Sequence, residues 1–186
     1  MEIEIKLPVG NMAGLRHQLK RLGFRVRCQR HFEDNTLFDT ATLALRQRGA
    51  MLRLRTAAGQ ALLTFKEKGR ASTHYKVRRE QETRVTNVEA VRAILNSLGY
   101  KPAFRYQKYR TVFMQAKGPG KLTLDETPIG TFIELEGPRR WIRMVANALG
   151  YRPKEFTTAT YAELYHAWRR QHAGPQGQMV FEKQKP

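Results

Sequence analysis

The chain has 186 residues, of which 41% are hydrophobic, so it can form one domain with a substantial core and does not have the composition of a disordered protein. No stretch approaches the roughly 18 to 20 consecutive apolar residues that a membrane helix needs, and the acidic start at Glu2 does not resemble a secretory signal peptide. Cys28 is the only cysteine, which excludes an internal disulfide and favours a cytoplasmic location. The net charge of +18 predicts a polyanionic partner.

Charged and apolar residues alternate with a period of two in several segments, which is typical of β-strands. The first segment, 2–7, places Glu2, Glu4 and Lys6 on one face. Similar alternation recurs at 52–55, 63–68, 75–84, 108–111, 122–125 and 133–136. The pattern predicts several strands that each carry one charged and one apolar face.

Four segments have apolar residues at helical spacing instead. They cover about 12–22, 88–98, 139–149 and 158–172. Asn11 and Asn87 are suitable N-caps for the first two helices, and each of the first three helices ends at a glycine. Each predicted helix has an apolar stripe and therefore needs an apolar surface to cover.

The sequence shows no interdomain linker, so residues 1–171 are predicted to form one domain. We expect a mobile loop at 69–74, between two strands. The final segment, 172–186, is polar and rich in Gln, Gly, Lys and Pro, and we expect a loose tail there.

The charged faces of the strands could point either to solvent or into the interior of a closed sheet. In an ordinary antiparallel sheet they would face solvent. Here, however, strand after strand mixes paired carboxylates with paired cations, and four helices must cover the apolar side of the same sheet. Closing the sheet would turn the charged faces inward. We therefore predict an α+β fold in which helices pack outside a closed antiparallel β-barrel of about eight strands.

A charged interior is costly unless its charges are paired or a ligand completes them. Hard divalent cations prefer oxygen ligands, and seven carboxylates are candidates: Glu2, Glu4, Glu80, Glu82, Asp125, Glu134 and Glu136. A highly charged anion would suit the cations Lys6, Arg53, Arg55, Lys66, Lys68, Arg78, Lys108 and Arg110. Phosphoryl transfer requires carboxylates that hold a metal ion in one part of the site and cations that bind phosphate in another part.

These segments also resemble a known family, the CYTH domain or triphosphate tunnel metalloenzymes, which includes class IV adenylyl cyclases, thiamine triphosphatases and inorganic triphosphatases. EIEIK at 2–6 resembles the family's ExExK signature. The other motifs follow in the family's order: LRLR at 52–55, TFK at 64–66, REQE at 79–82, KYR at 108–110, LD at 124–125 and GTFIELE at 130–136. FEDNTLFD at 32–39 and TATYAEL at 158–164 resemble the cyclase-like branch, although the first lacks its tyrosine and the second has Thr in place of Ser.

The resemblance implies an eight-stranded tunnel that depends on Mg²⁺ or Mn²⁺ and binds a small molecule containing a triphosphate. It implies metal ligands among Glu2, Glu4, Glu80, Glu82, Glu134 and Glu136, and phosphate contacts from Lys6, Arg53, Arg55, Lys66 and Arg110. Asp125 would either orient a basic neighbour or contact a metal. Asp125 and the five phosphate-binding residues are therefore the predicted catalytic residues.

Three functions remain open. Hydrolysis of a triphosphate (inorganic, thiamine or nucleoside) is favoured, because water needs no dedicated nucleoside pocket. The alternative is a class IV adenylate cyclase, in which the ribose 3′-hydroxyl of ATP attacks the α-phosphate and releases pyrophosphate. The third is a non-catalytic module that binds polyphosphate or RNA, although such a module gains nothing from acids in its site.

Further cations are predicted on helices and loops outside the barrel, where they could steer an anionic substrate or bind a polyanion weakly. They are Arg16, Lys20, Arg21, Arg25, Arg27, Arg139, Arg140, Arg143, Arg152, Arg169 and Arg170. We expect no membrane partner, and we expect a monomer or a homodimer.

Overall fold

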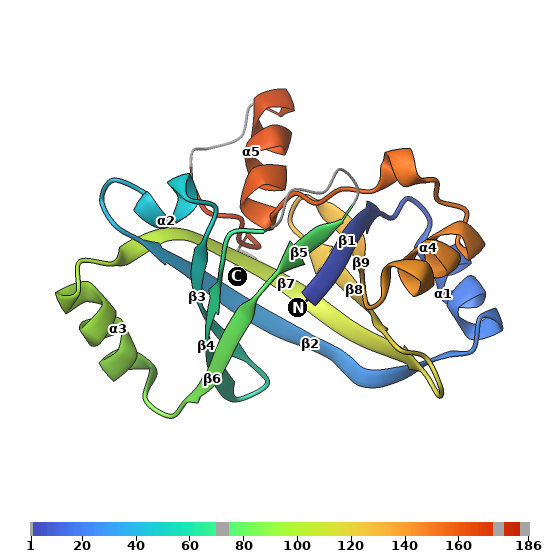
Figure 1. The fold of residues 1–186 in the computed structure, drawn as a ribbon, viewed down its shortest axis with the longest axis horizontal. Helices are drawn as coiled ribbons and strands as arrows, with labels where there is room; N and C mark the ends of the chain where they lie inside the picture. The colour runs from blue at the N-terminus through green and yellow to red at the C-terminus, as the bar shows by residue number, and fades with distance from the viewer. Residues whose placement is uncertain (1, 70–74, 173–176, 183–186) are drawn as a thin grey trace.

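A computed structural model describes residues 2–69, 75–172 and 177–182, and shows an antiparallel sheet curled into a nearly closed barrel with helices outside it (Figure 1). The strands are β1 (Glu2–Pro8), β2 (Phe24–Asp39), β3 (Met51–Ala57), β4 (Gln60–Lys66), β5 (Lys76–Arg78), β6 (Glu80–Val85), β7 (Lys101–Gln115), β8 (Lys121–Thr127) and β9 (Gly130–Glu136). The helices are α1 (Met12–Arg21), α2 (Ala44–Gln47), α3 (Val88–Ser97), α4 (Arg139–Ala148), α5 (Tyr161–Gln171) and the 3₁₀ helix η1 (Pro153–Glu155). The predicted α+β barrel is confirmed.

The sheet has nine strands instead of the expected eight, because the predicted strand at 75–84 is interrupted. The strand order is β5-β1-β9-β8-β7-β2-β3-β4-β6. Only Arg79 separates β5 from β6, yet β5 pairs with β1 at one edge and β6 pairs with β4 at the other. The backbone N–H of Glu67 donates to the carbonyl of Arg79 (3.0 Å). This single chain segment therefore bridges the two edges of the nearly closed barrel.

The two longest strands, β2 and β7, pair with each other in the middle of the sheet. Each follows a helix that begins in the predicted way, since the side chain of Asn11 accepts from Gly14 N and that of Asn87 from Ala90 N, both at 2.9 Å. Gly23, which ends the first of these helices, has φ of +78°, a conformation that glycine adopts without a steric penalty.

The apolar faces of the strands lie outward, under the helices. Leu19 of α1 and Ile142 of α4 belong to the same buried cluster as Ile5 and Leu135 of the barrel. Smaller clusters lie under α3 and α5 and are built around Leu95 and around aromatic rings, respectively. Because side chains alternate across a strand, this packing turns the charged faces into the barrel. The predicted inward orientation of the charges is therefore confirmed.

The expectation of a loose tail is wrong for residues 178–181. Met179 is completely buried, and its backbone exchanges hydrogen bonds with Arg105 O (3.0 Å) and Gln107 N (2.8 Å) of β7. The Phe181 ring lies 5.2 Å from that of Tyr109. An apolar side chain within the polar segment accounts for this docking. The rest of the predicted tail, at 173–176 and 183–186, lies outside the described residues, as does the loop at 70–74.

Two helical features differ from expectation. The short helix α2 was not predicted; the carboxylate of Asp39 accepts hydrogen bonds from the backbone N–H groups of Leu45 and Arg46, both at 2.9 Å. The last helix begins at Tyr161, where Thr160 and Glu163 form a capping box. Within the described residues, none of these helices combines the length and the apolarity needed to cross a membrane.

Candidate active site

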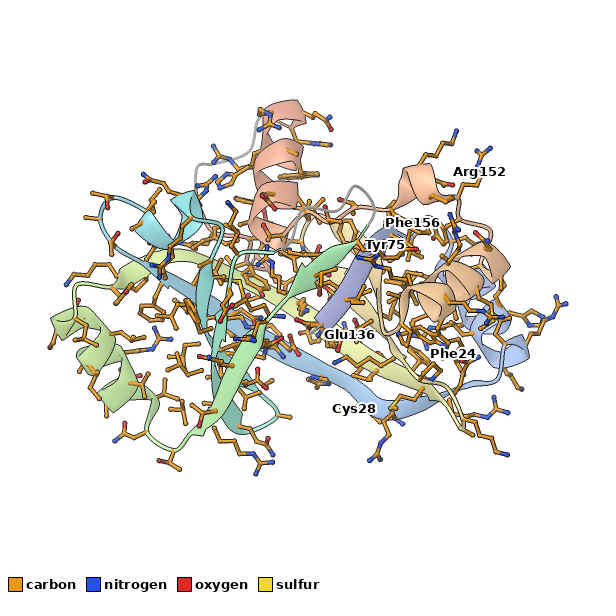
Figure 2. The ribbon with its side chains drawn as sticks, viewed as in Figure 1. Phe24, Cys28, Tyr75, Glu136, Arg152 and Phe156 are labelled. Carbon is orange, nitrogen blue, oxygen red and sulfur yellow. The ribbon has the colours of Figure 1, made fainter. Side chains whose placement is uncertain are left out.

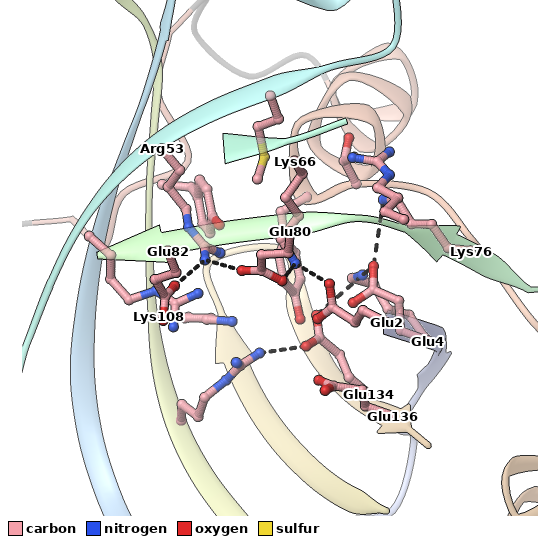
Figure 3. Close-up of a pocket in the computed structure, with 18 of the residues that line it drawn as sticks. Glu2, Glu4, Arg53, Lys66, Lys76, Glu80, Glu82, Lys108, Glu134 and Glu136 are labelled. Atoms are coloured by element: carbon pink, nitrogen blue, oxygen red, sulfur yellow. Dashed lines mark hydrogen bonds and ion pairs between the residues drawn. The ribbon is translucent and has the colours of Figure 1, made fainter. Parts of the chain in front are cut away.

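Charged side chains of both signs converge on a cavity of about 300 Å³ inside the barrel (Figure 3). It is lined by Glu2, Glu4, Lys6, Met51, Arg53, Arg55, Lys66, Lys76, Arg78, Glu80, Glu82, Tyr106, Lys108, Arg110, Lys121, Glu134, Glu136, Thr160 and Tyr161. All the predicted site residues lie here except two. Lys68 borders a neighbouring hollow, and Asp125 is buried behind the cavity wall.

The register of the strands brings these residues together. On β1 and β9, Lys6 lies opposite Glu134, and Glu4 lies opposite Glu136. On β4 and β6, Lys66 lies opposite Glu80. Directly opposite residues in an antiparallel pair are close neighbours, so Lys6 and Lys66 each meet a carboxylate across the ladder, whereas Glu4 and Glu136 bring two carboxylates together.

Lys66 lies between two carboxylates from different strands. Its Nζ is 2.6 Å from Glu2 Oε2 and 2.8 Å from Glu80 Oε2. Burial and a hydrogen bond with Glu80 raise the pKa of Glu2. Burial acts in the same direction on Glu80, but hydrogen bonds from Glu2 and Lys66 outweigh it and lower the pKa of Glu80. The two carboxyl groups therefore differ in their readiness to hold a proton.

Lys6 holds a second pair of carboxylates in the same way. Its Nζ lies 3.4 Å from Glu4 Oε1 and 3.2 Å from Glu134 Oε1. Burial alone would raise the pKa of Glu4, but Lys6 and Lys76 lower it to about 2. Burial would also disfavour the charge on Lys6, but Glu134 and Glu4 outweigh it and raise the lysine's pKa. This cluster is therefore fully ionised near neutral pH.

Lys76 was not among the predicted site residues, although it shares the charged face of the strand at 75–84. Its Nζ is 3.7 Å from Glu4 Oε1. Burial, reinforced by the nearby ammonium group of Lys6, lowers the pKa of Lys76 to about 7. This lysine is therefore the cation of the cavity whose charge changes near neutral pH.

Asp125 organises the cations at the back of the cavity. It is completely buried and accepts four hydrogen bonds: from Lys108 Nζ (2.7 Å), from Arg110 Nε and Nη2 (2.6 Å each) and from the hydroxyl of Tyr161 (2.6 Å). Arg110 Nη2 also donates to Glu134 Oε2 (2.6 Å). Both oxygens of Asp125 are thus engaged by protein donors, which is the geometry of a residue that orients basic neighbours.

Glu33 was missed as a site residue, although it lies in the segment at 32–39 that resembles the cyclase-like branch. It is 2% exposed and its carboxylate lies 3.5 Å from Lys108 Nζ, 3.6 Å from Arg55 Nη1 and 4.0 Å from Arg110 Nε. Burial opposes ionisation, but these cations prevail and hold the pKa of Glu33 below its usual range. Glu33 and Asp125 together anchor the cations from behind.

Two further arginines point into the cavity from β3. Arg53 Nη2 donates to Thr64 Oγ1 (3.2 Å), whose hydroxyl donates to Glu82 Oε2 (2.7 Å). Arg55 Nε donates to the side-chain oxygen of Asn35 (3.1 Å). The Nε of Arg53 is buried and has no hydrogen-bond partner within the described residues. An anion in the cavity would supply the acceptor that this group lacks.

The carboxylates suit a hard divalent cation in chemistry, but they do not form a complete cage. Within the described part of the chain, no three Asp, Glu, His or Cys side chains are grouped closely enough to hold a metal ion by themselves. Instead, the pairs Glu2–Glu80 and Glu4–Glu134 each flank a lysine. Mg²⁺ is commonly held by one or two carboxylates together with substrate phosphates and water, so the donor set fits such an ion.

The nearly closed barrel with interior charges of both signs defines an α+β tunnel fold, and similarity to known proteins shows its family. The family model described as the CYTH domain matches residues 1–148, and the chain belongs to this family. Members of this family are enzymes that act on triphosphates, generally with a divalent metal ion.

Similar proteins carry names of the same kind. A protein of Methanocaldococcus jannaschii named "Putative adenylate cyclase" is 27% identical over 136 residues, which cover 73% of this chain and 76% of that protein. A solved structure with a similar name, from Vibrio parahaemolyticus, has a TM-score of 0.77 at 22% identity and covers 89% of this chain and 97% of that one. A Hippeastrum structure, named a "Putative adenylyl cyclase" that "reveals a dominant" triphosphatase activity, has a TM-score of 0.67 at 18% identity, covering 90% and 96%.

Proposed function

We propose that this chain is a metal-dependent phosphohydrolase that acts on a triphosphate-containing substrate. The observation that carries the proposal is the pairing of charges in one cavity. Lys6 and Lys66 each lie between two carboxylates, in the same cavity that Arg53 and Arg110 enter. Cations for phosphate and oxygen donors for a metal thus lie within reach of one extended ligand.

The chain's own residues would hold the phosphate groups. Arginine binds phosphate oxygens two at a time, and Arg110 is held in place by Asp125 and Glu134. Arg53 brings an Nε–H that has no hydrogen-bond partner among the residues that the structure describes. Because these donors are anchored before substrate arrives, little reorganisation is needed when charge builds up on the transferred phosphoryl group.

The residues that would hold the metal are Glu4, Glu80 and Glu134, with Glu82 and Glu136 on the same lining, which leaves Glu2 for proton transfer. Such an ion, when bound, neutralises phosphate charge and makes water more acidic. We assign Asp125 to positioning and not to metal binding, because protein donors engage both of its oxygens.

Hydrolysis requires a group that removes a proton from water. Glu2 is suited to this role, since burial and its hydrogen bond with Glu80 raise its pKa, whereas the pKa values of Glu4, Glu80 and Glu134 are lowered, so Glu2 is a better proton acceptor than those three. The water oxygen would bond to the terminal phosphorus as the bond from that phosphorus to the bridging oxygen breaks. The products would be orthophosphate and a diphosphate, with the proton of water left on Glu2.

A second candidate, cyclisation of ATP, is favoured by a neighbouring apolar cavity of about 260 Å³. It shares Met51, Arg78 and Thr160 with the charged cavity, so one ligand could extend through both. Leu52 and Phe104 contribute apolar surface that suits an aromatic base. The sequence alone did not reveal this pocket.

We place hydrolysis first because the carboxylates of the apolar cavity are already engaged. Asp39 accepts hydrogen bonds from the backbone at the start of α2, and Glu163 accepts from Thr160 N and its hydroxyl. Asp39 therefore has both oxygens engaged, and Glu163 is a poor proton acceptor for a ribose hydroxyl because, despite burial, the hydrogen bonds from Thr160 lower its pKa. The names of the relatives from Methanocaldococcus and Hippeastrum are compatible with both reactions.

Product identification separates these functions. The purified protein is incubated with Mg²⁺ or Mn²⁺ and, separately, with ATP, thiamine triphosphate or inorganic triphosphate, and the products are identified by mass spectrometry. Orthophosphate that disappears on addition of EDTA supports hydrolysis and identifies the substrate. Cyclic AMP with pyrophosphate would instead assign the cyclase reaction. No turnover of any of the three would overturn the proposal and favour a non-catalytic polyphosphate- or RNA-binding module.

A further inference from the structure

The positive charge of this protein is concentrated outside the barrel. Of its 34 Lys and Arg residues, nine line the charged cavity. Of its 16 Asp and Glu residues, six line that cavity and two, Glu33 and Asp125, are buried beside it. This leaves 25 basic and eight acidic residues for the rest of the chain. The interior is close to neutral, so the tunnel does not account for the net charge of +18.

Part of the excess lies at one end of the barrel, where α1 and α4 cover the same core cluster (Figure 1). Neither helix contains an acidic residue. Their exposed basic residues are Arg16, Lys20, Arg21, Arg139, Arg140 and Arg143. Nearby η1 adds Lys154 and the flanking Arg152, of which Arg152 pairs with Glu155 (3.7 Å). The arginines of α4 make no ion pair with any residue that the structure describes.

These arginines border a shallow hollow of about 460 Å³, which we call the α4 hollow. It is lined by Tyr75, Arg139, Arg140, Arg143, Met144 and Asn147. The guanidinium group of Arg139 lies 5.5 Å from the centre of the Tyr75 ring. That ring packs edge-on against Phe156, with centroids 6.4 Å apart, so both rings lie at this end of the molecule (Figure 2).

We propose that the α4 hollow binds single-stranded RNA. Its three guanidinium groups, which have no carboxylate partner in the described part of the chain, would contact successive phosphates. The Tyr75 ring offers a surface on which a base can stack, and the amide of Asn147 offers hydrogen bonds to a base edge. Inorganic polyphosphate could use the arginines but neither of these groups. A membrane would be expected to meet more exposed apolar side chains than Met144 alone.

A second hollow connects this surface to the charged cavity. It has a volume of about 520 Å³, shares Tyr75 with the α4 hollow, and shares Lys76 and Arg78 with the cavity. Lys68, which was predicted to bind phosphate in the tunnel, lies on this connecting path. A bound strand thus has a basic path along which to extend toward the cavity. Binding in the α4 hollow does not depend on the proposed hydrolysis.

The test measures the affinity of a fluorescently labelled single-stranded RNA of mixed sequence by anisotropy at several salt concentrations. The test variant is Arg139→Ala/Arg140→Ala/Arg143→Ala. A control with the same change in net charge is Arg48→Ala/Arg79→Ala/Arg84→Ala, at exposed positions just after α2, between β5 and β6, and on β6. Tyr75→Leu removes the stacking surface without a change in charge. Long-chain polyphosphate and anionic vesicles are used as competitors.

The proposal predicts that the α4 variant loses at least tenfold in RNA affinity. The slope of the logarithm of the binding constant against the logarithm of the salt concentration should become shallower by about two, since each phosphate contact on a single strand contributes about 0.7. The control variant should lose less than threefold. Tyr75→Leu should weaken RNA binding several-fold and leave polyphosphate binding unchanged. Equal losses in the two triple variants would overturn the proposal in favour of non-specific attraction. Stronger binding of polyphosphate or vesicles than of RNA would also overturn it.

Discussion

Tyr161 and Asp125 join the last helix to the inside of the barrel through one short hydrogen bond. The Tyr161 hydroxyl, at the first residue of α5, donates to Asp125 Oδ2 at 2.6 Å, and both side chains are buried. Burial and the adjacent carboxylate raise the pKa of Tyr161 well above its ordinary value. The phenol therefore remains a donor at any physiological pH, and α5 is tied to the residue that orients Lys108 and Arg110.

The first prediction concerns this buried network. Asp125→Asn keeps the shape of the side chain but leaves Lys108 and Arg110 without their closest negative partner. Removal of one member of a buried charge network costs about 3 to 5 kcal/mol. We expect a loss of this size in the free energy of unfolding, measured with urea. Tyr161→Phe removes one hydrogen bond to a charged group and should cost about 1.5 to 3 kcal/mol. Equal stability of Asp125→Asn and the wild type would contradict this role.

The second prediction concerns acid. Lys108, Arg110 and Arg55 hold the pKa of Glu33 below the ordinary value of 4.5 despite its burial. A carboxylate with a lowered pKa in the folded state stabilises the fold above the unfolded-state pKa, and this contribution is lost as the pH falls toward the folded-state pKa. The free energy of unfolding should therefore decrease below about pH 4.5. In Glu33→Gln this decrease should be smaller, and an unchanged pH profile would refute the assignment.

Lys76 should make anion binding depend on pH near neutrality. Its pKa of about 7 means that it is charged at pH 6 and largely neutral at pH 8.5. In EDTA, the affinity for inorganic triphosphate should therefore fall as the pH rises through 7, by several-fold in calorimetric titrations. Lys76→Met should bind more weakly at pH 6 and should lose most of this change. A variant that retains the wild-type pH profile would show that another group is responsible.

The docked tail provides a test of packing. Met179 is completely buried in the aromatic cluster beneath α5. Met179→Ala should lower the free energy of unfolding by about 2 to 5 kcal/mol, the usual cost of such a truncation in a core. Glu182→Ala, at an exposed position three residues later, should change it by less than about 0.5 kcal/mol. If both substitutions changed the free energy of unfolding by a similarly small amount, residues 178–181 would not be packed against the core.

The sequence predicted the architecture well because the alternation of charged and apolar residues is a local signal. Once Ile5 and Leu135 must lie under helices, the faces with Lys6 and Glu134 have to point inward. The break at Arg79 was not predictable in this way. It arises because the two halves of one segment pair with different edges of the barrel, which is a property of closure and not of the residues at 75–84.

The sequence predicted which residues line the candidate site more fully than it predicted which of them interact with each other. Whether Asp125 contacts a metal or orients a cation depends on Tyr161, which is 36 residues away and arrives with a separate helix. Glu33 does not alternate with a second carboxylate along β2, so the sequence offered no alternating pair of acidic residues to notice. Its role follows from the register, which places it opposite Lys108. Met179 was overlooked because a single apolar residue in a polar segment gives no periodicity.

The most direct test of the proposed function is the steady-state rate of orthophosphate release from the preferred triphosphate, in Mn²⁺, by the wild type and by Glu4→Gln. Glu4 lies 3.4 Å from Lys6 Nζ and lines the cavity, and the substitution removes one negative charge while keeping the size of the side chain. We predict that kcat falls at least a hundredfold while the free energy of unfolding remains within about 2 kcal/mol of the wild type. Equal rates for the two proteins would contradict the assignment of this cavity as the active site.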